Sequence, residues 1–237
     1  MKAVVVRVVV PLAVLAVQGR ANLARANPGG GAWLHYELTG LRAVEDTPAA
    51  PRDLVLAGAR LHGIVGGRVA YHVGLDLAAG ATVGDTGFAY DVALFPAGLA
   101  VRLGRTGVLA LGAGVGASGA TGTLDDAVAL PLELTAELGG GRVRLLLRAR
   151  ASYVAAADAR QDGAPSTSLA DELDASLGIR IGKHAERFGF ASGNGYFVGV
   201  SYRELGGARF AGLVLGYSID GATPVRRDRE WTCENCD

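Results

Sequence analysis

The chain has 237 residues, of which 50% are apolar, and its 23 basic and 23 acidic residues give a formal net charge of zero. This length allows one domain with a large buried or lipid-facing area. Because there is no basic excess, the usual electrostatic reason to expect nucleic acid as a partner is missing. The 36 glycines follow no G-X-Y period, which excludes a collagen-like chain.

The N-terminal segment has the features of an export signal. Lys2 and Arg7 precede the apolar run 8–17, which is too short to cross a bilayer as a helix. Ala24 and Ala26 then form an A-x-A-like cleavage site. We therefore expect a signal peptide over residues 1–26; the alternative is a buried strand of a cytosolic protein.

Ten later segments are predicted to be strands, because most of them alternate apolar and polar residues with a period of two. In chain order they are 33–41, 54–65, 69–77, 88–103, 108–117, 128–138, 143–153, 173–181, 196–202 and 211–219. Segment 88–103 contains Pro96, which removes a ladder donor, so it is either one bulged strand or two short ones. No convincing helix is predicted.

The hairpin over 128–153 has the strongest pattern. Leucines line one face of both strands, while glutamates of the first and arginines of the second line the other. Pairing Leu138 with Val143 across a turn at 139–141 predicts that Glu137 lies opposite Arg144. The same register predicts Glu133 opposite Arg148. The predicted turn, apolar face and charges therefore agree on one register.

The connections between strands carry a second signal. Long polar connections follow the first, third and seventh segments, and glycine turns at 66–67 and 139–141 separate them. This alternation is typical of a barrel with short turns at one end and long loops at the other. The stretch 183–195 is read as a long connection where a short one is expected. We predict an all-β fold, a single antiparallel up-and-down transmembrane β-barrel of about ten strands over residues 27–220, with eight or twelve strands as alternatives.

In this pattern of long alternating strands the chain resembles bacterial outer-membrane β-barrel proteins, the small OmpA-like and porin-like group. Such barrels end on a last strand with an aromatic residue, and Tyr217 and Ile219 occupy that strand here. The chain differs from the group in continuing over a polar tail, 221–237. The resemblance implies a location in the outer membrane with membrane lipid as the partner. The alternative is an exported soluble β-barrel or β-sandwich that binds a lipid or a protein.

The polar faces of the predicted strands supply the candidate functional residues. In a narrow barrel these faces point into the lumen, where charges must find partners. The expected lumen ion-pair network comprises Arg60, His62, His72, Asp76, Glu133, Glu137, Arg144, Arg148 and Arg150. We expect it to fill the lumen of a structural or narrow porin-like protein, in which passage of a small solute is the open alternative.

Catalytic and cofactor chemistry is not predicted. His35 and Glu37 share a strand face, and His62, His72 and Asp76 can meet across the second hairpin, but no serine lies in a G-x-S-x-G context. The expectation is therefore a protein that is not an enzyme and has no cofactor. Two cysteines occur, both in the tail, and we expect a local disulfide there rather than a metal site, which needs further ligands. They are Cys233 and Cys236.

Overall fold

Ten strands make up the computed structural model. It describes residues 30–45, 51–67, 69–83, 87–103, 107–120, 124–140, 142–157, 172–187, 190–205 and 208–223. The strands are β1 (Gly30–Ala43), β2 (Asp53–Gly66), β3 (Val69–Val83), β4 (Phe88–Leu103), β5 (Gly107–Ala120), β6 (Leu124–Gly140), β7 (Val143–Ala157), β8 (Glu172–Arg187), β9 (Phe190–Leu205) and β10 (Ala208–Thr223). The expected signal peptide and the two tail cysteines lie outside the described residues.

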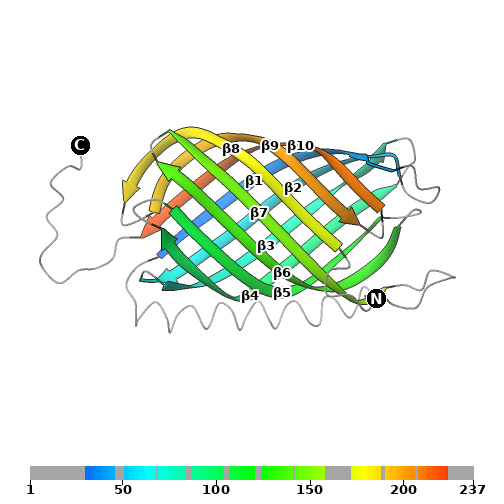
Figure 1. Ribbon diagram of the computed structural model, residues 1–237, viewed down its shortest axis with the longest axis horizontal. Coiled ribbons are helices and arrows are strands. Elements are labelled where there is room, and N and C mark those ends of the chain that lie inside the picture. The colour runs from blue at the N-terminus through cyan, green and yellow to red at the C-terminus, as the bar shows by residue number, and fades with distance from the viewer. Residues whose placement is uncertain are drawn as a thin grey trace, which may run out of the picture.

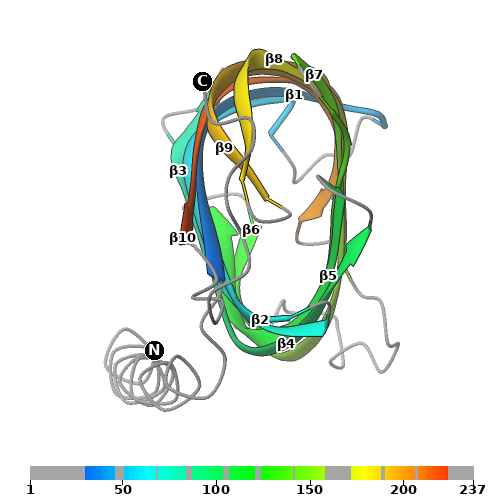
Figure 2. The same ribbon diagram turned by 90° about the vertical axis from the view of Figure 1, so that its left-hand side faces the viewer.

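The strands form one closed barrel. Each strand pairs antiparallel with its neighbours in sequence, and β1 closes the sheet by pairing with β10 from Gly30 opposite Thr223 to Ala43 opposite Phe210. Figure 1 shows the strands inclined to the long axis of the barrel, and Figure 2 shows them as a ring around it. The predicted all-β, up-and-down barrel of ten antiparallel strands is confirmed. No helix in the described part of the chain could cross a membrane.

The strands have 14 to 17 residues each, and all except β4 are longer than predicted. β3 continues to Val83, so the long connection predicted after the third strand is wrong. β8 continues to Arg187 and β9 begins at Phe190, so the long connection predicted over 183–195 is also wrong. Backbone pairing continues through alanine, glycine and polar residues in these regions, where there is little apolar contrast to reveal an alternating face.

The two ends of the barrel differ in their connections. At one end, which we call the loop end, the strand ends are separated by 9 residues between β1 and β2 and by 14 between β7 and β8, and by shorter connections after β3, β5 and β9. The connections 67–68, 104–106, 141–142 and 188–189 lie at the other, which we call the turn end. These two names are used below to give positions along the lumen.

Pro96 lies within one continuous strand. β4 runs from Phe88 to Leu103, and its pairing with β5 shifts between Leu94 and Ala97. The carbonyl group of Pro96 accepts a hydrogen bond from the hydroxyl group of Tyr71. Because proline has no N–H for the ladder, a bulge at this point lets the strand continue on both sides.

The β6–β7 hairpin differs from its predicted register by two residues. Leu138 pairs with Leu145, and Gly140 pairs with Val143. The reason is that β6 continues through Gly139, whose φ of 118° suits glycine, into a turn of only two residues. A shift of two residues leaves each side chain on its predicted face.

The two faces of the wall have opposite chemistry. Outward side chains such as Leu132, Val200 and Leu213 are between 51% and 62% exposed. Inward side chains on the same wall include Glu133, which is 1% exposed, and Arg180, which is 0% exposed. The barrel is thus apolar outside and ionic inside.

Candidate functional site

The middle of the lumen contains a band of buried charged side chains that we call the ionic layer. Every strand except β5 contributes to it, because each places charged residues at inward positions. Its members are Glu37, Arg60, His62, Asp76, Asp91, Glu133, Glu137, Arg144, Arg148, Arg150, Asp174, Arg180, Arg203 and Asp220.

Arg148 lies at the centre of the ionic layer and contacts three carboxylates. Its Nε donates to Glu133 Oε2 at 2.6 Å, and its Nη2 donates to Asp76 Oδ2 at 2.6 Å. Its Nη1 donates to Asp174 Oδ2 at 2.9 Å. These contacts join β7 to its neighbours β6 and β8 and to β3 across the lumen, so one guanidinium connects opposite sides of the barrel.

Two arginines near Arg148 share a pair of aspartates. Arg203 Nη2 lies 2.7 Å from Asp174 Oδ2, and Arg203 Nη1 lies 3.3 Å from Asp91 Oδ2. Arg150 donates to Asp91 and lies 3.4 Å from Asp174. Every charge here has an oppositely charged neighbour, and this attraction opposes the cost of removing the charges from water.

A second group of charges lies on β6, β7, β8 and β10. Glu137 Oε1 is 3.0 Å from Arg144 Nη1 and 2.8 Å from Arg180 Nη1. Arg180 also donates to Asp220. Arg180 thereby ties the last strand to the hairpin that contains Glu137.

Histidines and Trp33 form the part of the site nearest β1 to β3. His62 Nε2 lies 2.8 Å from Asp76 Oδ1, and His62 Nδ1 lies 3.0 Å from His72 Nε2. The Trp33 ring stacks on both imidazoles, with centroids at 5.5 Å from His62 and 6.1 Å from His72. Beside them, Glu37 accepts from Arg60 Nη2 at 2.7 Å. His62 is 2% exposed and His72 is 0% exposed, so both rings are buried among these groups.

Apolar clusters lie on either side of the ionic layer. The loop-end cluster consists of Leu41, Leu54, Leu56, Ala89, Ala120, Leu205, Ala208 and Phe210. The turn-end cluster consists of Trp33, Ile64, Ala70, Ala100, Val108 and Ala110. Each side chain in both clusters is at most 5% exposed. The lumen therefore has three layers, apolar, ionic and apolar.

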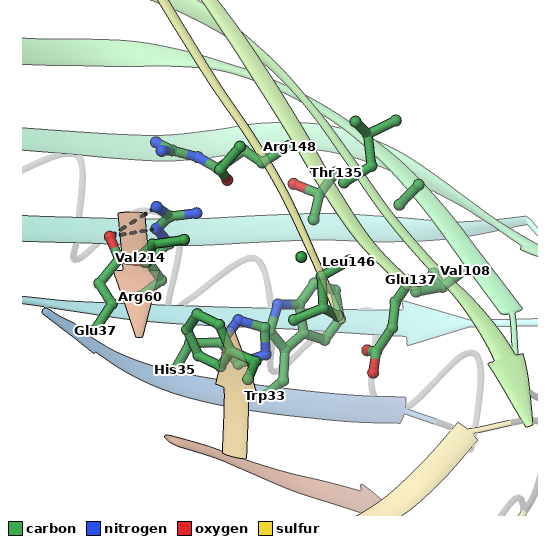
Figure 3. A pocket seen from close by; sticks show the side chains of 15 residues that line it. Trp33, His35, Glu37, Arg60, Val108, Thr135, Glu137, Leu146, Arg148 and Val214 are labelled. Carbon is green, nitrogen blue, oxygen red and sulfur yellow. Dashed lines mark hydrogen bonds and ion pairs between the residues drawn. The ribbon is translucent and has the colours of Figure 1, made fainter. Parts of the chain in front are cut away.

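A small cavity borders the ionic layer inside the lumen. Its volume is about 40 Å³, and its lining includes Trp33, Glu37, Arg60, Thr135 and Arg148. Figure 3 shows these side chains converging on it from opposite walls, with the Glu37–Arg60 ion pair at one side. A cavity of this size holds a few water molecules at most.

The structure places the nine sequence-predicted lumen residues in contact with one another or with further lumen charges. Arg60 is opposite Asp76 in the backbone register, yet its side chain binds Glu37. His72 contacts His62, and Arg150 contacts Asp91 and Asp174. The predicted contacts of Glu133 with Arg148 and of Glu137 with Arg144 exist.

Sequence reasoning left several members of the ionic layer out of the network. Asp174 and Arg180 stand on the polar face of a predicted strand, so their inward parity could have identified them. Arg203 and Asp220 lie one residue beyond the predicted strand ends, and Asp91 lies in the uncertain segment around Pro96. Arg203 and Asp220 can be assigned to the lumen only when their strands are given the longer bounds that the structure shows.

The other catalytic candidates are also buried in the lumen. His35 is 8% exposed and contacts the ring of Phe197, with centroids 5.7 Å apart. Glu37 is occupied by Arg60.

Together, the fold and the lumen define the chain as a closed ten-stranded barrel with an apolar outer surface and charged side chains packed inside. No family model matches the chain, and no curated protein matches it in sequence. It is similar to the β domain of the Bordetella autotransporter Brka, with 14% identity over 80% of this chain and 98% of that one, at a TM-score of 0.35. It is also similar to the translocator domain of autotransporter NalP from Neisseria meningitidis, with 14% identity over 92% of this chain and 99% of that one, at a TM-score of 0.31. Neither similarity supports a functional assignment at these TM-scores.

Proposed function

We propose that this chain is a structural barrel of the bacterial outer membrane, closed to solutes by its own side chains. The observation that carries the proposal is the three-layered lumen, in which the ionic layer lies between two apolar clusters. Membrane lipid is the proposed partner of the outer surface.

The outer surface supports the membrane location. Large apolar side chains point outward on every strand, among them Leu38, Leu111 and Ile179, which are 45% to 52% exposed. An apolar surface that surrounds a soluble protein would favour aggregation, whereas lipid is its natural solvent. Strands of 14 or more residues also exceed the roughly 9 to 11 that a tilted strand needs to cross a bilayer.

The contents of the lumen support a closed barrel over an open pore. Ion pairs such as Arg148 with Asp76 join opposite walls, so they cross the path that a solute would take. Apolar residues including Leu54 and Phe210, both 0% exposed, cover this layer at the loop end. The cavity beside the ionic layer measures about 40 Å³, well below the roughly 300 to 1,000 Å³ of a typical small-molecule pocket.

We also propose that the barrel has no catalytic role. Its histidines are held in place by other lumen groups, such as Asp76 against His62 and the Phe197 ring against His35. Both histidines are under 10% exposed, so a substrate could not approach them without disrupting the packing.

Two experiments, carried out one after the other, test the proposal. The full chain is expressed, extracted from membranes with detergent and analysed by electrophoresis with and without heating, and we expect a heat-dependent change in migration typical of a folded membrane barrel. A protein that stays soluble after the membranes are removed would instead be the exported soluble alternative.

Planar-bilayer recording of the same preparation then tests the closed lumen. We expect no discrete conductance steps, while a porin of known conductance in the same bilayer serves as the positive control. Reproducible steps of one size from the folded barrel would show that the lumen conducts and would overturn the closed-barrel proposal.

A further inference from the structure

Three side chains of the ionic layer present metal-binding atoms to one point. His62 Nε2, Asp76 Oδ1 and Glu133 Oε1 all lie within 4.8 Å of one another. His62 Nε2 is 2.8 Å from the aspartate oxygen and 3.8 Å from the glutamate oxygen. Two donor atoms bound to one tetrahedral Zn²⁺ at about 2.0 to 2.2 Å lie roughly 3.3 to 3.6 Å apart. The two separations from His62 Nε2 lie on either side of this range, so small side-chain shifts would let all three atoms bind one ion.

Each of the three side chains is also held by a group outside the trio. Arg148 donates from Nε to Glu133 Oε2 and from Nη2 to Asp76 Oδ2, both at 2.6 Å. It therefore occupies the outer oxygen of each carboxylate and leaves the inner oxygens facing His62. Protein metal ligands are commonly oriented by a surrounding shell of hydrogen bonds of this kind.

The imidazole of His62 is fixed in the same manner. Its Nδ1 lies 3.0 Å from His72 Nε2, which leaves Nε2 for the two carboxylates. The Trp33 ring stacks on it at an interplanar angle of 12°. The hydroxyl of Thr135 donates to Glu133 Oε1 at 3.2 Å, and a carboxylate oxygen has a second lone pair for an ion.

The charge around the trio favours a cation. The ionic layer, as defined above, contains one more carboxylate than guanidinium, and Arg148 divides its charge among three carboxylates. A metal ion among Asp76, Glu133 and His62 would add positive charge where two buried carboxylates converge, and such charge lowers the cost of burying them.

From this arrangement we propose that His62, Asp76 and Glu133 form a binding site for a divalent transition-metal ion such as Zn²⁺, with Arg148 and His72 as positioning residues. One imidazole and two carboxylates suit such an ion. The ion takes the place of the proton shared by His62 Nε2 and Asp76 Oδ1, and that proton is released to solvent as the site forms, since metal-bound imidazole nitrogen and carboxylate carry no proton on the bound atom. Because both apolar clusters cover the site, the ion enters while the barrel folds and is retained afterwards.

The test uses the full chain refolded into detergent micelles with Zn²⁺, then washed with a chelator and analysed for metal by mass spectrometry. We expect about one zinc per folded barrel, and at least about tenfold less in His62→Gln and Glu133→Gln. His35→Gln is the matched control, because it removes another buried lumen histidine outside the trio and should retain zinc. Folded wild-type barrel without zinc, or equal zinc in His62→Gln, would overturn the proposal.

X-ray absorption on the zinc-loaded wild-type chain provides a test that does not depend on the folding of a variant. We expect a first shell of nitrogen and oxygen with the scattering of a single imidazole. Scattering from sulfur would place the zinc on the tail cysteines, Cys233 and Cys236, and two or more imidazoles would place it on another set of histidines. Either result would contradict the assigned site.

Discussion

Arg148 and Glu133 form an ion pair at 2.6 Å although they are not opposite each other in the β6–β7 hairpin. The residue opposite Glu133 is Arg150, and the residue opposite Arg148 is Thr135. The pair is therefore diagonal, offset by two residues along the strand, a separation that long side chains can span. Glu37 with Arg60 has the same offset. Diagonal pairing leaves each guanidinium free to contact further strands across the lumen.

An arginine on the outer surface near mid-wall should prevent stable assembly. Leu132 is 51% exposed at the centre of β6, and we expect Leu132→Arg to lower the free energy of unfolding by about 2 to 4 kcal/mol in lipid vesicles. Val83→Arg, at the loop end of β3, is the control and should cost about 0 to 1 kcal/mol. Equal losses measured by denaturant titration would argue against a lipid-facing wall.

Removal of the Arg180 side chain should leave the carboxylates of Glu137 and Asp220 without the guanidinium that binds both of them. Arg180 is 0% exposed and binds Glu137 and Asp220, so we expect Arg180→Leu to cost about 3 to 5 kcal/mol of unfolding free energy. Arg42→Leu breaks an exposed ion pair with Asp53 and should leave the unfolding midpoint unchanged. A smaller effect of the Arg180 change than of the Arg42 change would show that the ionic layer contributes little to stability.

Two glycines of neighbouring strands should respond differently to the same substitution. A Cβ on Gly216 would overlap the Phe197 ring and the carbonyl oxygen of Tyr36, whereas a Cβ on Gly40 meets nothing within 4 Å. We expect Gly216→Ala to destabilise the barrel by about 1 to 3 kcal/mol, as overpacking usually does. Gly40→Ala should be tolerated. Urea unfolding of both variants tests this difference. Equal unfolding midpoints would contradict the close contact between Gly216 and the Phe197 ring.

Loss of one apolar cluster should weaken the barrel without opening it. Phe210 is 0% exposed in the loop-end cluster, and Phe210→Ala should cost about 3 to 5 kcal/mol because it leaves a cavity. The ionic layer and the turn-end cluster remain, so we still expect no conductance steps in a planar bilayer. Phe88→Ala, at an outward position that is 50% exposed, is the control and should cost less. Conductance from the Phe210 variant would place the whole barrier at the loop end.

Alternation along the chain was sufficient to predict the barrel and the orientation of its wall. Residues two apart point to the same side of a strand, so the leucines and arginines of 143–153 could be assigned to opposite faces without any tertiary information. Ten strands were found in the predicted order. Their ends could not be located, because alanine, glycine and polar residues continue the ladder around 183–195 without showing a preferred face.

The sequence by itself determined that the chain is built of alternating strands and which face of each predicted strand points into the lumen, because both depend on a local period of two. Only the tertiary structure decided which charges meet. Arg148 and Asp76 are 72 residues apart and lie on strands that do not pair with each other, and closure of the barrel brings them to 2.6 Å. The filling of the two ends also depended on closure, since Leu41 and Phe210 come together only when β1 pairs with β10. Strand pairing around a closed wall is a property of the whole chain, and no local pattern contains it.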